Sequence, residues 1–337
     1  MERAIVFDVG GTYLRSGALL ADGNLRQTGK RRLKNHVDGS EPGAIWCDLV
    51  ETIVRSVGEH APDAPRSSPL VIAFPGPVTA SGRVLSAPSL TGMRGCPYEL
   101  GAELAQRTGR RIHLLNDVSA AAWYVGTQTR ARRFVVVTVS SGIGSKIYDR
   151  SQSPAVLDHV PYAGEIGHLV VDDAADAPLC DCGARGHLGA VASGRGIERA
   201  ARRVALGDPE AFGRSLCARK LGAKAERLTN EDHLVPAAAQ ADAWALGIVR
   251  SCTIPLARAL CTLLLGAGLD EVAVIGGFAQ GLGQTYVRIL GEEFARVATY
   301  ELLDEHPAQR IWLATAGEET CLLGAAEYAA RMLGAGG

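Results

Sequence analysis

Residues 5–15 read Ile-Val-Phe-Asp-Val-Gly-Gly-Thr-Tyr-Leu-Arg, and the fold can be inferred from this stretch. Its first five residues form an apolar run in which only Asp8 is polar, a pattern typical of a buried strand. The Gly-Gly-Thr turn at 10–12 ends this strand. A second strand is predicted over 13–20 and a third from Leu25.

The same pattern returns about 130 residues later. Residues 134–139 predict a strand, residues 140–144 (Ser-Ser-Gly-Ile-Gly) a turn, and residues 145–148 a further strand. Another apolar strand, 272–275, ends in a Gly-Gly pair. Because 337 residues exceed what one small core usually fills, we predict two lobes built on a duplicated β-hairpin domain.

The spacing of apolar residues in the rest of the sequence predicts further strands and helices, as in an α/β fold. Strands are predicted at 70–74 and 112–115, and helices over 43–59, 97–108, 119–125, part of 236–265 and 317–333. The connection from about 150 to 200 is irregular and rich in glycine.

Composition narrows the class of protein. Thirty-five basic and 36 acidic residues give a net charge of −1, and no long basic stretch suggests nucleic-acid binding. The N-terminus lacks the apolar core of a signal peptide, and we find no apolar run near the ~18 residues of a membrane span. The eight cysteines are scattered apart from Cys180 and Cys182, which fits a reducing compartment. We expect a soluble, cytoplasmic protein without a nucleic-acid or membrane partner.

Three glycine turns after β-branched strands point to phosphate binding, since glycine lets backbone N–H groups approach phosphate oxygens. Asp8 is placed to hold Mg²⁺, which prefers carboxylate and phosphate oxygens, and Arg15 could face a transferred phosphoryl group. There is no GxxxxGK[ST] P-loop, and Ile147 breaks the dinucleotide-binding pattern that Gly142 and Gly144 begin.

The pair Asn116-Asp117 follows a predicted strand. Asp117 could accept the proton of a hydroxyl nucleophile while Asn116 holds a neighbouring hydroxyl. The alternative is that the pair merely caps the helix predicted from Ser119.

In this order the motifs resemble those of the ROK family of repressors, open reading frames and sugar kinases, whose first phosphate motif is DxGGTxxR. The matching segments are residues 8–15, Asn116-Asp117, 142–144, 164–168, 180–183, Ser193-Gly194 and 275–277. The resemblance implies an actin-like (ribonuclease H-like), duplicated two-lobed α/β kinase with ATP in an interlobe cleft. It also implies a homodimer.

The resemblance also assigns roles. Asp117 becomes the catalytic base and Asp8 serves Mg²⁺; the ATP phosphates and adenosine are bound by Gly10, Gly11, Thr12, Arg15, Ser140, Ser141, Gly142, Gly144, Gly276 and Gly277. The substrate ring is bound by Asn116, Glu165, His168 and Ser89, with Glu165 and His168 on one helical face. The implied lobes are 1–117 (small), 118–316 (large, with a zinc loop at 164–194) and a C-terminal helix, 317–337, that packs back on the small lobe.

A structural zinc site is implied by the same resemblance. The family usually uses one His and three Cys, with CxCGxxGC in the loop. Here the ligands would be His168, Cys180, Cys182 and His187, with an imidazole in place of the last thiolate. Two thiolates and two imidazoles still suit tetrahedral Zn²⁺; the alternative is that zinc binding is lost.

The ring site departs from the sugar kinases of the family at two positions. Gly189 stands where those enzymes have the Glu that contacts the anomeric end of the ring, and Ser89 stands where Asn is common. A lost carboxylate removes a charged hydrogen bond at that end and leaves the CH₂OH end unchanged. This suggests a C7-cyclitol (valiolone-type) substrate, as in C7-cyclitol 7-kinases; the alternative is the 6-hydroxyl of glucose or an N-acetylhexosamine.

Two other classes share this fold. ROK repressors carry an added DNA-binding region, for which we expect no room before Asp8. A catalytically silent sugar-binding protein would not need both Asp8 and Asp117.

Overall fold

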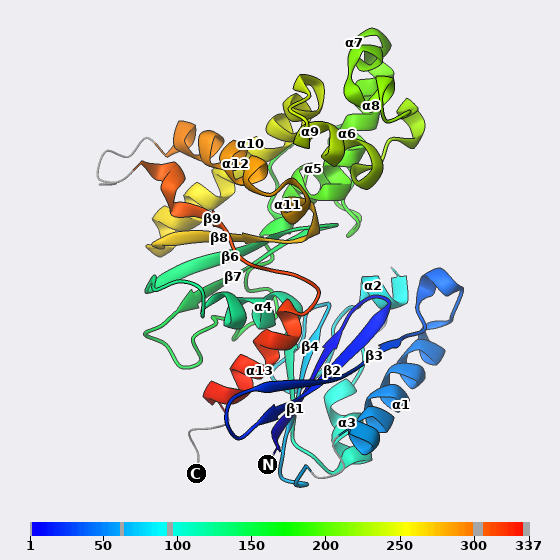
Figure 1. Cartoon of the computed structure of the whole chain (residues 1–337), viewed down its shortest axis with the longest axis vertical. Coiled ribbons are helices and arrows are strands. Elements are labelled where there is room, and N and C mark those ends of the chain that lie inside the picture. Colours follow the sequence, from blue (N-terminus) through cyan, green and yellow to red (C-terminus); the bar gives the residue numbers. More distant parts are fainter. Residues whose placement is uncertain (1, 61–63, 93–96, 299–305, 333–337) are drawn as a thin grey trace. The chain divides into compact units, whose positions relative to one another are not determined.

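The computed structural model describes residues 2–60, 64–92, 97–298 and 306–332 and contains two compact units (Figure 1). Unit 1 consists of Met1–Arg130, Tyr148–Ala163 and Gly317–Gly337, and unit 2 of Ala131–Ile147 and Gly164–Ala316.

The lobe boundary predicted at residue 117 therefore differs from the division seen here. Helix α4 (Asp117–Val125) packs against α13 (Thr320–Met332), which holds α4 in unit 1. Gly324 makes this crossing close, because a Cβ there would lie 1.7 Å from the carbonyl oxygen of Ala120. Residues 333–337 of the predicted C-terminal segment lie outside the described residues.

Unit 1 is built on a five-stranded sheet of order β3-β2-β1-β4-β5. Strand β1 is antiparallel to β2 and parallel to β4, and β4 is parallel to β5. The strands are β1 (Glu2–Val9), β2 (Tyr13–Leu20), β3 (Leu25–Arg32), β4 (Leu70–Phe74) and β5 (Ile112–Asn116). The helices are α1 (Pro42–His60), α2 (Pro88–Thr91), α3 (Leu100–Thr108), α4, α13 and the 3₁₀ turn η1 (His36–Asp38).

Side chains of β1 alternate between two apolar layers, as the period of a strand requires. Ile5, Phe7 and Val9 share one cluster with residues of α1 and α3, whereas Ala4 and Val6 share another with residues of α13. Asp8 continues the second series, so its carboxylate belongs to the face that α13 covers.

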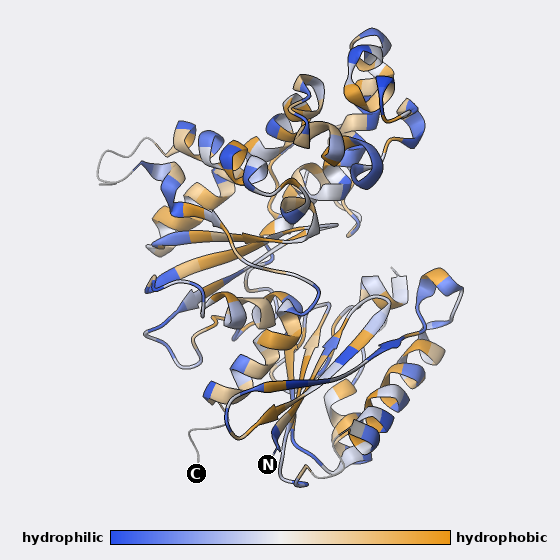
Figure 2. Ribbon diagram, in the orientation of Figure 1, coloured by the Kyte–Doolittle hydropathy of each residue, from blue (hydrophilic) through white to orange (hydrophobic). Residues whose placement is uncertain are grey.

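Unit 2 repeats this plan in a four-stranded sheet of order β7-β6-β8-β9. As in unit 1, a hairpin is followed by two parallel strands, because β8 is parallel to both β6 and β9. The predicted duplication is thereby confirmed. Figure 2 shows apolar residues concentrated along the inner strands of both sheets, whereas the edge strand β3 is mostly hydrophilic. The strands are β6 (Arg133–Val139), β7 (Ile143–Asp149), β8 (Glu271–Ile275) and β9 (Ile311–Leu313).

The longest helix of unit 2 in the described part of the chain is α10 (Ala243–Ala267), which contacts α5, α6, α9 and α12. The others are α5 (Leu188–Ala192), α6 (Gly194–Gly207), α7 (Pro209–Arg214), α8 (Leu216–Arg219), α9 (Val235–Ala239), α11 (Gly277–Leu282) and α12 (Gln284–Val297). Short helical turns occupy η3 (Ile166–His168), η4 (Ala225–Arg227), η5 (Asn230–Leu234) and η6 (Pro307–Arg310).

Helix α10 corrects one statement of the sequence analysis. Its 25 residues are long and apolar enough to cross a membrane by length and composition alone. Arg250 and Arg258 interrupt the run, which is why no continuous apolar stretch stands out in the sequence. Of its most apolar 18-residue window, 56% is buried inside the protein, as in the core helix of a soluble domain.

Candidate active site

Asp8 and Arg15 are opposite one another across the β1–β2 hairpin of unit 1. Their side chains form an ion pair, with 3.3 Å between Arg15 Nη1 and Asp8 Oδ2. The pKa of Asp8 is raised to about 6. Burial is the largest cause and the charge of Asp117 adds to it, whereas Arg15 partly offsets the rise. A buried carboxylate with a raised pKa favours a bound cation, which fits the residue to a Mg²⁺ site.

Arg15 has a second partner that the sequence did not reveal. Its Nη2 lies 2.7 Å from Glu318 Oε2, and Lys30 Nζ lies 2.8 Å from the same oxygen. The two cations lower the pKa of Glu318 to about 2, with Lys30 the larger influence. No local spacing relates Glu318 to Arg15, which lies 303 residues earlier. The predicted phosphate-facing cation is thus held between two carboxylates.

The Gly-Gly-Thr turn of unit 1 is closely packed. The N–H of Gly10 donates to the carbonyl of Tyr13 at 2.8 Å, and Asn35 Nδ2 donates to the carbonyl of Gly11 at 3.1 Å. A Cβ on Gly11 would lie 3.0 Å from the carbonyl oxygen of Ser89, so larger residues are disfavoured there. Ser89 is exposed on α2 beside this turn. Thr12 is exposed as well, as a residue that receives a ligand should be.

Asn116 and Asp117 stand where β5 ends and α4 begins. Asn116 is the N-cap: its Oδ1 accepts from the N–H groups of Val118 (3.0 Å) and Ser119 (3.3 Å). Its Nδ2 also donates to the carbonyl of Gly76 at 3.0 Å. The capping alternative is therefore correct for Asn116, and one N–H of its amide is used inside the protein. Asp117 is partly exposed, and the N–H of Val118 donates to its Oδ1 at 2.8 Å.

The sequence analysis did not identify a thiol, that of Cys321, which lies near Asp117. Cys321, in the first turn of α13, has its Sγ 3.5 Å from the carbonyl oxygen of Asp117. Burial raises the thiol pKa well above its usual value, and the charges of Asp8 and Asp117 raise it further. The thiol is consequently protonated at neutral pH and inert as a nucleophile.

In unit 2, the two predicted nucleotide segments, Ser140–Gly144 and Gly276-Gly277, lie close together beside Gly194. The N–H of Gly194 donates to the carbonyl of Ser140 at 2.7 Å, and a Cβ on Gly277 would lie 3.6 Å from Ser140 Oγ. Gly276 has φ +103°, and a Cβ there would lie 2.5 Å from the carbonyl oxygen of Val139. The turn from Ser140 to Gly144 is closed by a bond from the N–H of Ser140 to the carbonyl of Gly142 (3.0 Å). The contacts leave little room for a side chain at Gly194 and Gly276, whereas Gly277 meets only an ordinary contact. Glycine at such positions lets the backbone approach a phosphate or nucleoside closely.

The helix expected to carry Glu165 and His168 is only the 3₁₀ turn η3, preceded by Glu165. Gly167 packs closely on β7 in this turn, because a Cβ there would lie 2.3 Å from the carbonyl oxygen of Ile143. The turn itself is stabilised by a bond from the N–H of His168 to the carbonyl of Glu165 at 3.0 Å. Gly189, in the adjacent α5, is also tightly packed: a Cβ would lie 3.2 Å from the carbonyl oxygen of Gly167.

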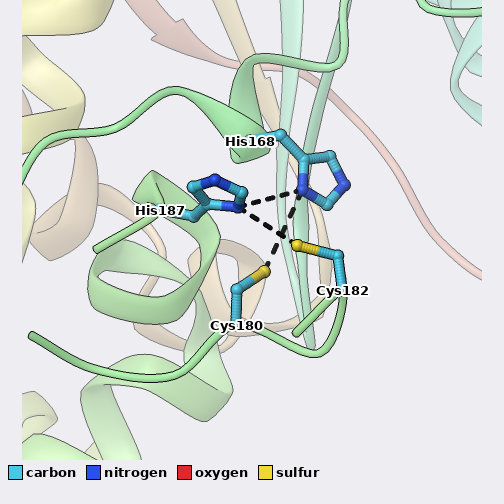
Figure 3. Close-up of side chains that lie close together, drawn as sticks. All are labelled: His168, Cys180, Cys182 and His187. Carbon is cyan, nitrogen blue, oxygen red and sulfur yellow. Dashed lines mark hydrogen bonds between the residues drawn. The ribbon is translucent and has the colours of Figure 1, made fainter. Parts of the chain in front are cut away.

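The four predicted zinc ligands gather in one cluster, with their ligand atoms all within 4.8 Å of one another (Figure 3). His168 Nδ1 lies 3.3 Å from His187 Nδ1 and 3.9 Å from Cys180 Sγ, and Cys182 Sγ lies 3.3 Å from His187 Nδ1. Tetrahedral zinc with Zn–N and Zn–S bonds of about 2.0–2.3 Å separates its ligand atoms by about 3.3–3.8 Å. The donor set and spacing therefore fit a zinc ion. Since Nδ1 of His168 faces the cluster, its Nε2 is turned away from the sulfur atoms.

Comparison with known proteins agrees with these motifs. A family model described as the ROK family matches residues 4–332. A C(7)-cyclitol 7-kinase from Streptomyces hygroscopicus subsp. jinggangensis is 37% identical over 337 residues, covering 98% of this chain and 95% of the relative. A 2-epi-5-epi-valiolone 7-kinase from Actinoplanes sp. is 30% identical, covering 90% of this chain and 85% of the relative.

A solved structure confirms the predicted fold class. The crystal structure of a ROK family glucokinase from Streptomyces griseus, in complex with glucose and AMPPNP, superposes with a TM-score of 0.71. The identity is 23%, and the match covers 96% of this chain and 98% of that one. Both are actin-like α/β folds with two lobes.

Proposed function

Because the chain belongs to the ROK family, we propose that it is an ATP-dependent kinase that phosphorylates the primary CH₂OH of a C7-cyclitol. The observation that carries this proposal is the pair of carboxylates at the ends of β1 and β5 in unit 1. Asp8 is buried and its pKa is raised, whereas Asp117 is partly exposed and its carboxylate is oriented by a backbone N–H. Two carboxylates in different environments suit two tasks, cation binding and proton transfer.

In this proposal Asp117 accepts the proton of the attacking hydroxyl. The N–H of Val118 holds the carboxylate in one orientation, and Asn116 fixes the start of the helix that carries it. Asp8 would hold Mg²⁺, which neutralises charge on the phosphates when bound. The turns at Gly10–Thr12 and Ser140–Gly144 would bind phosphates, and Gly276 and Gly277 the adenosine.

Glu165, His168 Nε2, Ser89 and the remaining N–H of Asn116 are the hydrogen-bonding groups we assign to the hydroxyls of the ring. His168, Cys180, Cys182 and His187 would hold structural zinc and so fix His168 in one tautomer. Support for this assignment comes from the fit of the cluster to tetrahedral geometry.

The choice of a cyclitol rests on the identity of 37% to a C(7)-cyclitol 7-kinase and on Gly189. The crowding at Gly189 gives a further reason. The backbone of Gly167 lies so close to Gly189 that a larger residue there would need its neighbours to shift. Phosphorylation of glucose or an N-acetylhexosamine is the alternative, which Glu165 and His168 would equally serve.

A phosphorylation screen tests the proposal. Purified protein, MgATP and a panel of hexoses, N-acetylhexosamines and C7-cyclitols should give a mass increase of one phosphoryl group with cyclitols and at most slow turnover with hexoses. The Asp117→Asn variant is the control for contaminating kinases. No phosphorylated product from any ring would contradict the kinase assignment.

A further inference from the structure

Arg195 contacts two loops of unit 2 that have separate proposed roles. Its Nε donates to the carbonyl of Ser141 at 2.8 Å, in the turn assigned to the phosphates. Its Nη2 lies 2.7 Å from Oδ2 of Asp181, which stands between Cys180 and Cys182. One guanidinium therefore joins the phosphate turn to the loop that carries two of the metal ligands.

The backbone around Arg195 is fixed on several sides. It lies in the first turn of α6, where Ser193 Oγ accepts from the N–H of Gly196 at 3.2 Å. The neighbouring Gly194 donates its N–H to Ser140, and its carbonyl accepts from Asn230 Nδ2 at 2.7 Å. The guanidinium thus reaches both loops from a fixed base, although the side chain is 57% exposed.

We propose that Arg195 is a positioning residue that couples the metal loop to the phosphate turn. When the metal orders the loop at 180–187, Asp181 holds one edge of the guanidinium, and the other edge then holds the carbonyl of Ser141 in place. This rests on the proposed function, because it takes the turn as the nucleotide site and the cluster as the metal site.

The chemistry of the side chain supports coupling rather than two unrelated contacts. A guanidinium is planar and rigid, so fixing one edge orients the other, whereas the single ammonium of a lysine cannot serve both partners in this way. An exposed ion pair alone contributes little, which limits the expected effect on overall stability. The effect should appear in nucleotide affinity and in metal retention.

Arg199 provides a matched control on the same helix. Its Nη1 lies 4.0 Å from Asp181 Oδ1, and its Nη2 donates to the carbonyl of Ala190 at 3.3 Å, but no contact to the phosphate turn is found for it among the described residues. Arg199→Met removes a cation beside the same carboxylate and leaves the bond to Ser141 intact.

The experiment measures binding without turnover. Titration calorimetry gives the Kd of a non-hydrolysable ATP analogue, and a coloured chelator gives the rate of zinc release, for Arg195→Met, Arg195→Lys, Asp181→Asn, Arg199→Met and the double variant Arg195→Met/Asp181→Asn. For Arg195→Met we expect a roughly three- to tenfold weaker Kd and faster zinc release, with kcat and the KM for the ring nearly unchanged. Arg195→Lys should recover little of the lost nucleotide affinity, and Arg199→Met should have the Kd and the rate of zinc release of the parent.

The decisive comparison is between single and double variants. Coupling predicts that Asp181→Asn weakens nucleotide binding, although no contact of Asp181 with the turn is found in the described part of the chain. It also predicts that Asp181→Asn has no further effect once Arg195 is Met. Unchanged nucleotide affinity in Asp181→Asn, or additive effects in the double variant, would overturn the proposal. If instead no ring is phosphorylated while the coupling is observed, the proposed function fails and this inference stands.

Discussion

The two hairpins of the duplicated fold both end their first strand in a glycine-containing turn, but the groups around the two turns differ. In unit 1, Asp8 lies two residues before the turn and is paired with Arg15 across the hairpin. In unit 2, the position two residues before Ser140 is Thr138, and the turn is bounded by backbone groups of Gly194 and Gly276. In the second turn, the carbonyl of Ser141 accepts a hydrogen bond from Arg195 of α6.

This difference indicates how a duplicated domain can divide a reaction. The unit 1 turn lies among carboxylates and cations, which suits metal binding and proton transfer. The unit 2 turn lies next to backbone groups of Gly194 and Gly276 and accepts a hydrogen bond from Arg195, a setting that suits the binding of a nucleotide. Substitutions in unit 1 should therefore lower kcat, whereas substitutions in the unit 2 turn should weaken nucleotide binding.

The largest effect should come from Asp117→Asn in unit 1. The amide keeps the shape of the carboxylate but cannot accept the proton, so kcat should fall by roughly 10²–10⁴-fold with the Kd values for ring and nucleotide nearly unchanged. Steady-state kinetics and calorimetry measure both quantities. Activity within tenfold of the parent would exclude Asp117 as the base.

Removal of the metal should have the next largest effect. Freshly purified protein should contain about one zinc per chain, and Cys182→Ser or a strong chelator should lower the melting temperature and abolish activity. Cys47→Ser is the matched control, because Cys47 is an exposed cysteine of unit 1 outside the cluster. Active protein without zinc by elemental analysis would refute the assigned ligands.

The pH dependence tests the charges of the unit 1 turn. Since burial raises the pKa of Asp8 from 3.8 to about 6, kcat/KM for MgATP should fall by roughly tenfold per pH unit below about pH 6, as the carboxylate is protonated. Between pH 3.8 and about 6 the folded chain binds more protons at Asp8 than the unfolded chain, so this group alone lowers stability as pH rises through that window.

Arg15→Met sharpens this test. Arg15 lowers the pKa of Asp8, so its removal should move the acid limb of the profile to higher pH, whatever happens to the absolute rate. An acid limb that keeps its position in this variant would mean that another group controls it.

A pair of adjacent glycines provides the smallest and most selective test, in unit 2. Gly276→Ala places a Cβ 2.5 Å from a backbone oxygen at φ +103°, so it should destabilise the fold, by about 1–3 kcal/mol in thermal or denaturant unfolding. Gly277→Ala meets only an ordinary contact at 3.6 Å, so it should fold normally. We expect it to raise the KM for ATP a few-fold at unchanged kcat; a fall in kcat alone would contradict the division between the two turns.

The sequence predicted the repeated strand-turn-strand pattern because glycine and β-branched residues mark it locally. The family resemblance predicted that His168, Cys180, Cys182 and His187 gather, and these four side chains, which lie within 20 residues of one another in the chain, do form a cluster that could hold a metal ion. It could not predict the Glu318 partner of Arg15, since that contact depends on how α13 packs on the sheet. The three-residue strand β9 was missed for a similar reason: it is defined by pairing with β8 and has no long pattern of its own.

Asn116 and His168 show a second limit. Their residue types suit both a site and a helix end, and only the hydrogen bonds of Asn116 identify it as a cap. The helix expected around His168 is a single 3₁₀ turn, a length that the residue types alone do not indicate.

The most direct test of the central claim is the relative kcat/KM for a C7-cyclitol and for glucose with MgATP, with the position of the phosphate determined by NMR. We predict phosphate on the exocyclic CH₂OH and a higher kcat/KM for the cyclitol, because Gly189 offers no carboxylate to the anomeric end of a hexose. A kcat/KM for glucose above that of every C7-cyclitol tested would contradict the cyclitol assignment.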